Sequence, residues 1–71
     1  MKRCEAVALL KELVTFEFIE ASWVSIVNIK ENDYGLQFKT DSCVDIKEFA
    51  ERKNLVTDIN SEKNICTVHD P

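Results

Sequence analysis

The chain has 71 residues, of which 45% are hydrophobic and 31% are charged, and its formal net charge is −4. A chain of this length buries roughly 60% of the surface that its unfolded form exposes, which leaves room for one thin core. We therefore predict a single small domain over residues 1–71. The composition argues against intrinsic disorder, because disordered chains combine few apolar residues with a high net charge.

The distribution of charge argues against a dedicated nucleic-acid-binding protein. Neutralising phosphates requires clustered Lys and Arg side chains, whereas nine basic residues are scattered here among thirteen acidic ones. The apolar stretch near the start breaks at Lys11 and Glu12, which is too early for a signal peptide. No segment approaches the roughly 18 apolar residues of a membrane span. We expect a soluble, cytoplasmic chain with no membrane partner.

Apolar residues from Arg3 to about Phe18 recur with the spacing of an amphipathic helix. At 100° per residue they fall within an arc of roughly 200°, and charged residues lie opposite. Ile19 falls outside this arc, which indicates that the helix ends near there. Apolar and polar residues also alternate over Val14–Phe18, so a strand is the alternative for that segment.

A pair of strands is predicted next. The segment Trp23–Ile29 is β-branched, aromatic and apolar on both faces, a pattern typical of a central strand. Glu31–Gly35 is the clearest turn signal, and we expect Gly35 to supply the positive φ that closes a hairpin. From Leu36 to Thr40 apolar and polar residues alternate, as in an outer strand with one buried face.

A second helix is predicted from its capping residues. Asp45 is the expected N-cap, and Glu48 completes a capping box. Val44 is expected to pack on Phe49 as a hydrophobic staple. Asn54 can adopt the left-handed conformation that ends a helix. The stripe expected to face the core consists of Ile46, Phe49, Ala50 and Lys53.

Two further strands, Leu55–Ile59 and Ile65–His69, follow and are joined through residues 60–64. They form either a second hairpin or two strand extensions around a loop. The order helix, strand, strand, helix, strand, strand predicts an α+β two-layer sandwich with two helices on a mostly antiparallel four-stranded sheet. The similar tripeptides Lys11–Leu13 and Lys47–Phe49 hint at an internal repeat.

The three cysteines form an odd set without a CxxC pair, which favours reduced thiols, most of which act as small buried hydrophobes. Cys66 and His69 have the separation of half a zinc site, and Cys4 and Cys43 would complete a Cys₃His set. Residues three apart on a strand face opposite sides of the sheet, however. We expect no metal and no cofactor, and keep a thiol or metal-binding protein that uses these four residues as an alternative.

His69 is the only histidine, and it lies two positions before the final residue of the sequence, Pro71. We expect it to be solvent-exposed without an orienting partner, and we predict that the chain is not an enzyme. Trp23, Tyr34 and Phe38 lie near lysines in the first hairpin, and aromatic residues on a sheet can stack on bases. Phe38 and Lys39 point to opposite faces of a strand, so a weak single-stranded nucleic-acid binder is only a second alternative.

The favoured hypothesis is a non-catalytic protein-interaction module that acts through an apolar surface. The first strand has apolar residues on both faces, and helices are expected on only one face of the sheet. A contiguous exposed apolar patch usually marks an interface. The candidate interface residues are Trp23, Val24, Ile26, Val27 and Val68. The expected partner is a second copy in a two-fold dimer, or else another protein.

Overall fold

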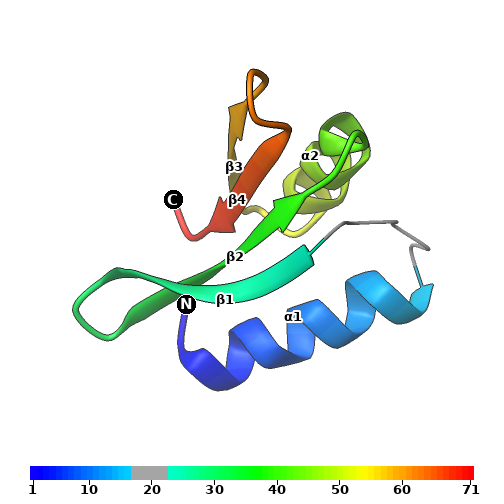
Figure 1. Cartoon of the computed structure of the whole chain (residues 1–71). Coiled ribbons are helices and arrows are strands. Elements are labelled where there is room, and N and C mark those ends of the chain that lie inside the picture. Colours follow the sequence, from blue (N-terminus) through cyan, green and yellow to red (C-terminus); the bar gives the residue numbers. More distant parts are fainter. Residues whose placement is uncertain (17–22) are drawn as a thin grey trace.

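Six secondary-structure elements follow one another in the predicted order. The computed structural model describes residues 1–16 and 23–71. The elements are α1 (Arg3–Phe16), β1 (Trp23–Lys30), β2 (Asp33–Lys39), α2 (Cys43–Arg52), β3 (Val56–Asn60) and β4 (Ile65–His69). The strands form one four-stranded sheet in the order β1-β2-β4-β3, and each neighbouring pair is antiparallel. The predicted α+β class is confirmed (Figure 1).

The core lies between the sheet and the two helices, which pack against the same face. Pairing of β2 with β4 aligns Leu36 with Val68 and Phe38 with Cys66, and all four side chains are buried. The helical residues buried against them are Ala6, Leu9 and Leu13 of α1 and Ile46, Phe49 and Ala50 of α2. The apolar part of the stripe predicted for α2 is therefore confirmed, whereas Lys53 is exposed.

The positions of the first two strands in the sheet differ from the prediction. β1 was expected at the centre but lies at an edge, and β2 was expected outside but lies between β1 and β4. The two helix-strand-strand units meet through β2 and β4, so these strands are central. A strand that is apolar on both faces needs cover above and below the sheet, but not a neighbour on both sides.

The first helix is confirmed over Arg3–Phe16. At its start the Glu5 Oε1 atom accepts a hydrogen bond from the Lys2 amide at 3.1 Å, which is one half of a capping box. The strand alternative for Val14–Phe18 is wrong as far as residue 16, because those residues are helical. The rest of that segment, and the helix end expected near Ile19, lie outside the described residues.

The second helix begins earlier than its predicted cap. Ser42 occupies the N-cap position and makes no capping hydrogen bond through its side chain. Instead, the Ser42 amide donates to the hydroxyl of buried Thr40 at 3.1 Å. Asp45 therefore lies within the first turn, and the predicted capping box is wrong. Val44 is 66% exposed, so the predicted staple on Phe49 is wrong as well.

The end of α2 is as predicted. Asn54 has a φ of 60°, and its amide donates to the Glu51 carbonyl at 3.1 Å. The Leu55 amide donates to the Ala50 carbonyl at 2.8 Å. These two hydrogen bonds around a left-handed residue form a Schellman motif, which satisfies carbonyls at the helix end.

The first hairpin turns at a different residue from the one predicted. Asn32 has a φ of 57°, whereas Gly35 has no positive φ and belongs to β2. A Cβ atom at Gly35 would lie only 2.5 Å from the backbone oxygen of Val68. The glycine is therefore required by close approach of β2 to β4, not by the turn. The second predicted hairpin, between β3 and β4, is confirmed.

Candidate functional site

One face of the sheet is left uncovered by α1 and α2, which both lie on the other face (Figure 1). Its side chains alternate with the core residues along each strand, and pairing between strands arranges them in rows. We call this surface the open face. It consists of Trp23, Ser25, Val27, Ile29, Gly35, Gln37, Lys39, Val56, Asp58, Asn60, Ile65, Thr67 and His69.

The open face exposes several large apolar side chains. Trp23 is 39% exposed, Ile29 38% and Val56 37%, while Val27 and Ile65 are half-buried. The Cδ1 atom of Ile29 would lie 3.2 Å from a Cβ atom at Gly35, so the Ile29 side chain lies close to the glycine. The middle row of the open face consists of Ser25, Gln37, Thr67 and Asp58. In this row the Gln37 amide nitrogen donates to the Thr67 hydroxyl at 3.3 Å. Apolar residues therefore flank a small polar centre.

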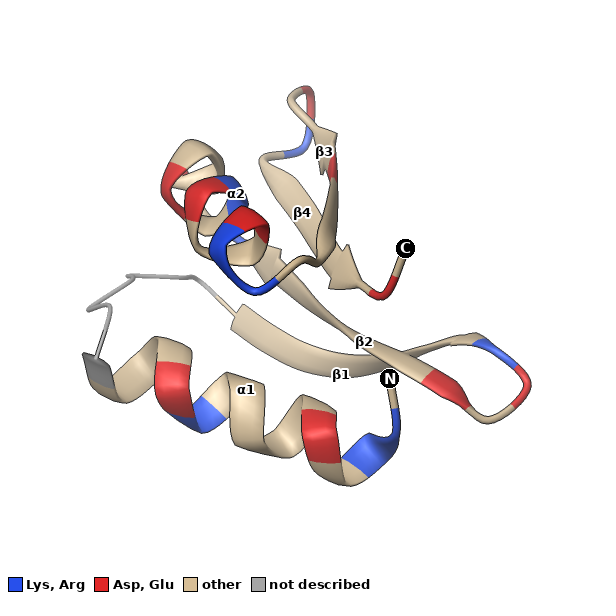
Figure 2. Ribbon diagram, turned by 180° about the vertical axis from the view of Figure 1, so that it is seen from behind, with Lys and Arg blue, Asp and Glu red and all other residues tan. Residues whose placement is uncertain are grey.

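The open face is close to electrically neutral. Its ionisable residues are Lys39, Asp58 and His69, although the chain as a whole has a net charge of −4. Figure 2 shows the charged residues mainly on the helices and turns, whereas most residues along the strands are uncharged. The excess negative charge is therefore carried mostly elsewhere on the molecule.

The structure divides the five predicted interface residues between two faces. Trp23 and Val27 lie on the open face, whereas Val24, Ile26 and Val68 belong to the face covered by the helices. Val68 is fully buried, and Val24 and Ile26 pack against the core. Sequence reasoning included both faces of β1 because it could not determine which one the helices cover. The apolar residues of the open face that it left out are Ile29, Val56 and Ile65.

His69 is held by two acceptors and is not the free side chain that was predicted. Its Nε2 atom lies 2.7 Å from Asp58 Oδ2, and its Nδ1 atom lies 2.7 Å from the backbone oxygen of Asp70. The Asp58 carboxylate and then the Asp70 carbonyl raise the pKa of His69 above its usual value. An imidazolium donates to both acceptors, so the ring is fixed in place. Pairing of β3 with β4 creates this contact between residues distant in sequence.

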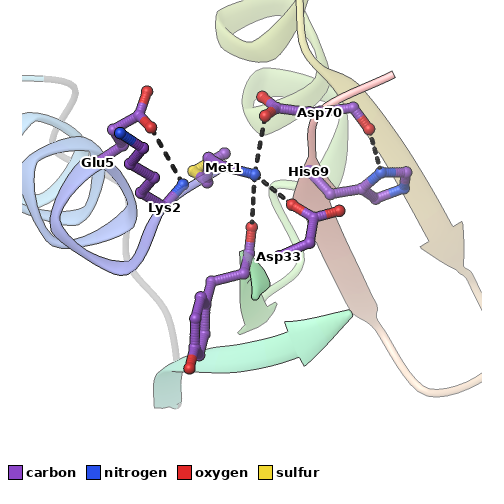
Figure 3. Close-up of polar contacts among 7 residues, drawn as sticks. Met1, Lys2, Glu5, Asp33, His69 and Asp70 are labelled. Atoms are coloured by element: carbon purple, nitrogen blue, oxygen red, sulfur yellow. Dashed lines mark hydrogen bonds and ion pairs between the residues drawn. The ribbon is translucent and has the colours of Figure 1, made fainter. Parts of the chain in front are cut away.

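Met1 extends the sheet beyond the end of β4. The Tyr34 amide donates to the Met1 carbonyl at 2.8 Å, and the Met1 amine donates to the Tyr34 carbonyl at 3.3 Å. The amine also pairs with the carboxylates of Asp33 and Asp70 (Figure 3). Hydrogen bonding to Asp33 raises the pKa of the amine, and the same contact lowers the pKa of Asp33. These contacts hold the Met1 backbone against β2 and next to the residue that follows β4.

The cysteines and His69 do not converge on one site. Cys4 is exposed on α1, and His69 lies on the open face, whereas Cys66 points toward the helices. Cys43 is at the start of α2, and its thiol donates to the Thr40 carbonyl at 3.5 Å. Burial, and after it the influence of the Cys43 thiol, raises the pKa of Cys66 to about 12. Among the described residues no group of three or more His, Cys, Asp or Glu side chains could hold a metal ion.

A shallow pocket lies between the two helices. It is lined by Glu12, Phe49, Arg52 and Lys53 and has a volume of about 260 Å³. The Lys53 ammonium and the Glu12 carboxylate form an ion pair across it at 2.8 Å. Small-molecule sites usually measure roughly 300–1,000 Å³ and have apolar walls. This pocket is smaller and is lined mainly by charged residues, so the open face is the better candidate for function.

Comparisons of the chain with protein-family models, with curated proteins and with solved structures gave no significant match. No helix in the described part of the chain is both long and apolar enough to cross a membrane. The fold defines a small two-layer α+β domain, and its most distinctive surface is the open face.

Proposed function

We propose that this chain is a non-catalytic protein-interaction module that forms a two-fold dimer through its open face. The observation that supports this proposal is the exposure of Trp23, Ile29 and Val56 on a sheet face that no described helix covers. Each Å² of apolar surface removed from water stabilises the associated state by roughly 25 cal/mol. A second sheet packed on this one would bury these side chains at the roughly 10 Å spacing of stacked sheets.

The charge of the open face favours a second copy of the chain as its partner. Two molecules that each have a net charge of −4 repel one another, and the repulsion is strongest where acidic groups meet. On the open face Asp58 is balanced by His69, which lies 2.7 Å away, and Lys39 adds a positive charge. Joining two open faces therefore keeps most acidic groups outside the contact. Two-fold pairing is the commonest way in which a self-complementary surface is closed.

The size of the open face indicates weak association. The four strands have five to eight residues, so the sheet spans about 19 Å across its strands and about 17–27 Å along them. That area is smaller than the roughly 800 Å² per partner that a standard stable interface buries. We therefore expect a dissociation constant in the micromolar range, so that monomer and dimer exchange at moderate protein concentration.

Sedimentation equilibrium combined with tryptophan fluorescence tests this proposal. Trp23 is the only tryptophan and lies within the proposed contact, so its emission should shift to shorter wavelength as the concentration rises from low to high micromolar. The mass should change from monomer to dimer over the same range. A monomeric mass and an unchanged emission at several hundred micromolar would refute self-association.

Two valine-to-lysine substitutions locate the contact. Val27→Lys places a charge in the open face and should weaken dimerisation by at least tenfold, because the lysine must be desolvated in the dimer. Val14→Lys is the matched control, since Val14 is 53% exposed on α1 and lies outside the open face. Circular dichroism verifies that both variants fold. If the two variants dimerise equally well, the interface lies on another surface of the molecule.

The two alternative functions have less support. The four residues of the thiol or metal alternative do not converge on one site, as described above. For the nucleic-acid alternative, Phe38 is buried and Tyr34 packs against the core, which leaves Trp23 beside Lys39 as the aromatic-basic pair on the open face. One such pair on an acidic protein supplies little phosphate neutralisation. Retention on a single-stranded oligonucleotide column at low salt would favour that alternative instead.

A further inference from the structure

We propose that the outer edge of β1 pairs with the same edge of a second copy of the chain, so that two four-stranded sheets join into one sheet of eight strands. The two β1 strands run antiparallel about a two-fold axis beside Ile26. This contact uses main-chain hydrogen bonds along the edge of the sheet, whereas the dimer proposed above stacks one open face on another. The two contacts are therefore independent.

The outer edge of β1 is open and lacks the usual protection. β1 lies at one end of the strand order and pairs only with β2 among the described strands. Edges are usually protected from further pairing by proline, by charge or by short length. β1 has eight residues and no proline, and its one charged residue, Lys30, is the last. The irregularity in its pairing with β2 lies beyond Asn28, so residues 23–28 form an unprotected edge.

The opposite edge of the sheet, formed by β3, is better protected. β3 has only five residues, and Asp58 is at its middle. Antiparallel pairing of two β3 strands about that residue would place two carboxylates opposite each other, and like charges in this position are destabilising. Self-association along an edge is therefore favoured at β1.

The helix-facing side of β1 is incompletely covered. Val24 and Ile26 pack against the core but are only half-buried. Their partners on β2, Phe38 and Leu36, have almost no exposed surface. The cover provided by the helices therefore thins from β2 to β1. A further strand beside β1 would bring side chains against Val24 and Ile26 and remove more of their apolar surface from water.

The sequence of β1 is complementary to itself when two copies run antiparallel. About an axis beside Ile26, this residue lies opposite its own copy on the helix-facing side. On the open face, Ser25 lies opposite Val27 of the second copy. β1 contains no carboxylate, so two chains that each have a net charge of −4 meet here without acidic groups in the contact. These features favour a second copy of the chain as the strand that fits this edge.

Edge pairing also enlarges the open face, a consequence that rests on the function proposed above. One open face of about 19 Å by 17–27 Å covers about 320–510 Å². An edge-paired dimer carries two open faces side by side, which together approach the roughly 800 Å² per partner of a standard interface. Two such dimers stacked through their open faces form a closed tetramer. We expect this tetramer at higher protein concentration than the open-face dimer.

Disulfide trapping tests the edge contact specifically. A disulfide requires Cα atoms about 4.4–6.8 Å apart. Residues directly opposite each other on neighbouring antiparallel strands have Cα atoms about 4.5–5.5 Å apart, whereas stacked sheets are separated by about 10 Å. A cross-link between cysteines introduced on β1 therefore reports edge pairing and not the open-face dimer.

The variants are Ser25→Cys and Val27→Cys, each in the full chain with Cys4→Ala, because the exposed Cys4 thiol would otherwise cross-link as well. Gln37→Cys in the same background is the matched control. Gln37 is half-buried on the open face like its partner Ser25, but it belongs to the interior strand β2. Each variant and the equimolar mixture of the two β1 variants are oxidised with diamide at high micromolar concentration. Circular dichroism verifies folding, and peptide mapping by mass spectrometry locates each disulfide.

We expect the mixture to form a cross-link between positions 25 and 27 about tenfold faster than Gln37→Cys forms its own dimer. The alkylation rate of each thiol by iodoacetamide corrects for differences in accessibility. An equally fast dimer of Ser25→Cys alone or Val27→Cys alone would also support edge pairing, with the axis displaced by one residue. The proposal is overturned if neither the mixture nor either variant alone cross-links faster than Gln37→Cys.

Adding Val56→Lys to the β1 variants separates this proposal from the open-face dimer. Val56 is exposed on the open face but lies on β3, away from the β1 edge. The substitution should weaken open-face dimerisation in sedimentation equilibrium and leave the rate of cross-linking unchanged. Cross-linking that persists while sedimentation is insensitive to Val56→Lys would count against the open-face dimer alone. Cross-linking that is lost with Val56→Lys in a folded variant would overturn edge pairing.

Discussion

His69 shows how a single side chain can be satisfied on both of its ring nitrogens. One nitrogen faces the Asp58 carboxylate and the other faces the Asp70 carbonyl, so the charged, doubly protonated ring is favoured. A free catalytic base needs an available lone pair, and neither nitrogen offers one in the imidazolium form. The contact of its ring with Asp58 links the end of β4 to β3 on the open face.

The His69 contacts predict a pH-dependent stability. The folded pKa of His69 is raised above its usual value of 6.5, so the folded state binds the proton more tightly. The resulting stabilisation is fully present below pH 6.5 and is lost as the pH rises through the raised pKa. Asp58→Asn should therefore lower the free energy of unfolding by up to about 1 kcal/mol at pH 6, and by less at pH 8.5.

Urea unfolding at both pH values measures this difference. Glu62→Gln is the matched control, because it removes one carboxylate from the exposed β3–β4 loop and Glu62 is not among the acceptors of the His69 ring. A loss of stability in Asp58→Asn that is equal at pH 6 and pH 8.5 would contradict the assignment of the shift to Asp58.

Among the elements, α2 is defined most sharply at its end. Its N-cap makes no side-chain hydrogen bond, whereas its last carbonyls are satisfied by amides of Asn54 and Leu55. The turn that delivers these amides requires the positive φ of Asn54. The stability of this helix therefore depends on one left-handed residue and on the burial of Ile46, Phe49 and Ala50.

Two substitutions of Asn54 test the need for that conformation. Asn54→Ala should lower the free energy of unfolding by about 1 kcal/mol, because a Cβ atom disfavours the left-handed region. Asn54→Gly should be neutral or stabilising, since glycine adopts a positive φ without that penalty. Chemical denaturation of the two variants gives the comparison. Similar denaturation midpoints for the alanine and glycine variants would mean that the fold does not require a positive φ at residue 54.

At the scale of the whole molecule, two helix-strand-strand units meet along the pairing of β2 with β4. The side chains facing the helices at this seam are all buried. On the opposite side, Gly35 lets the backbone of β4 approach β2 closely, since an added Cβ would meet the Val68 oxygen at 2.5 Å. The seam therefore depends on apolar contact on one side and on the absence of a side chain on the other.

Gly35→Ala should consequently destabilise the whole domain. The contact that the new methyl group would make is with backbone, so the strands themselves must move apart, and overpacking of this kind costs about 1–3 kcal/mol. Ser25→Ala serves as the control, because Ser25 lies on the same face of neighbouring β1 and loses an atom there. Equal urea midpoints for Gly35→Ala and the unaltered protein would show that β4 is not held close to residue 35.

Several features could be predicted from the sequence because they depend on short-range patterns. The period of apolar residues identified the first helix, alternation identified β2, and the αL preference of Asn54 identified the end of α2. The start of α2 was misplaced because Asp45 has the residue type of a cap, whereas buried Thr40 supplies the actual hydrogen bond from outside the helix. Gly35 was likewise assigned to a turn because the sequence does not show which strand approaches it.

For the candidate site, residue spacing was enough to predict that apolar residues exceed what one covered face of a sheet requires, and that Trp23 and Val27 share a face. Packing of the elements was needed to show that β1 is an edge strand, that Val68 is buried, and that Asp58 meets His69. Local patterns specify the two faces of each element, since they depend on residue spacing alone. Which face is covered, and which distant residues become neighbours, depends on how the elements pack to bury the most apolar surface.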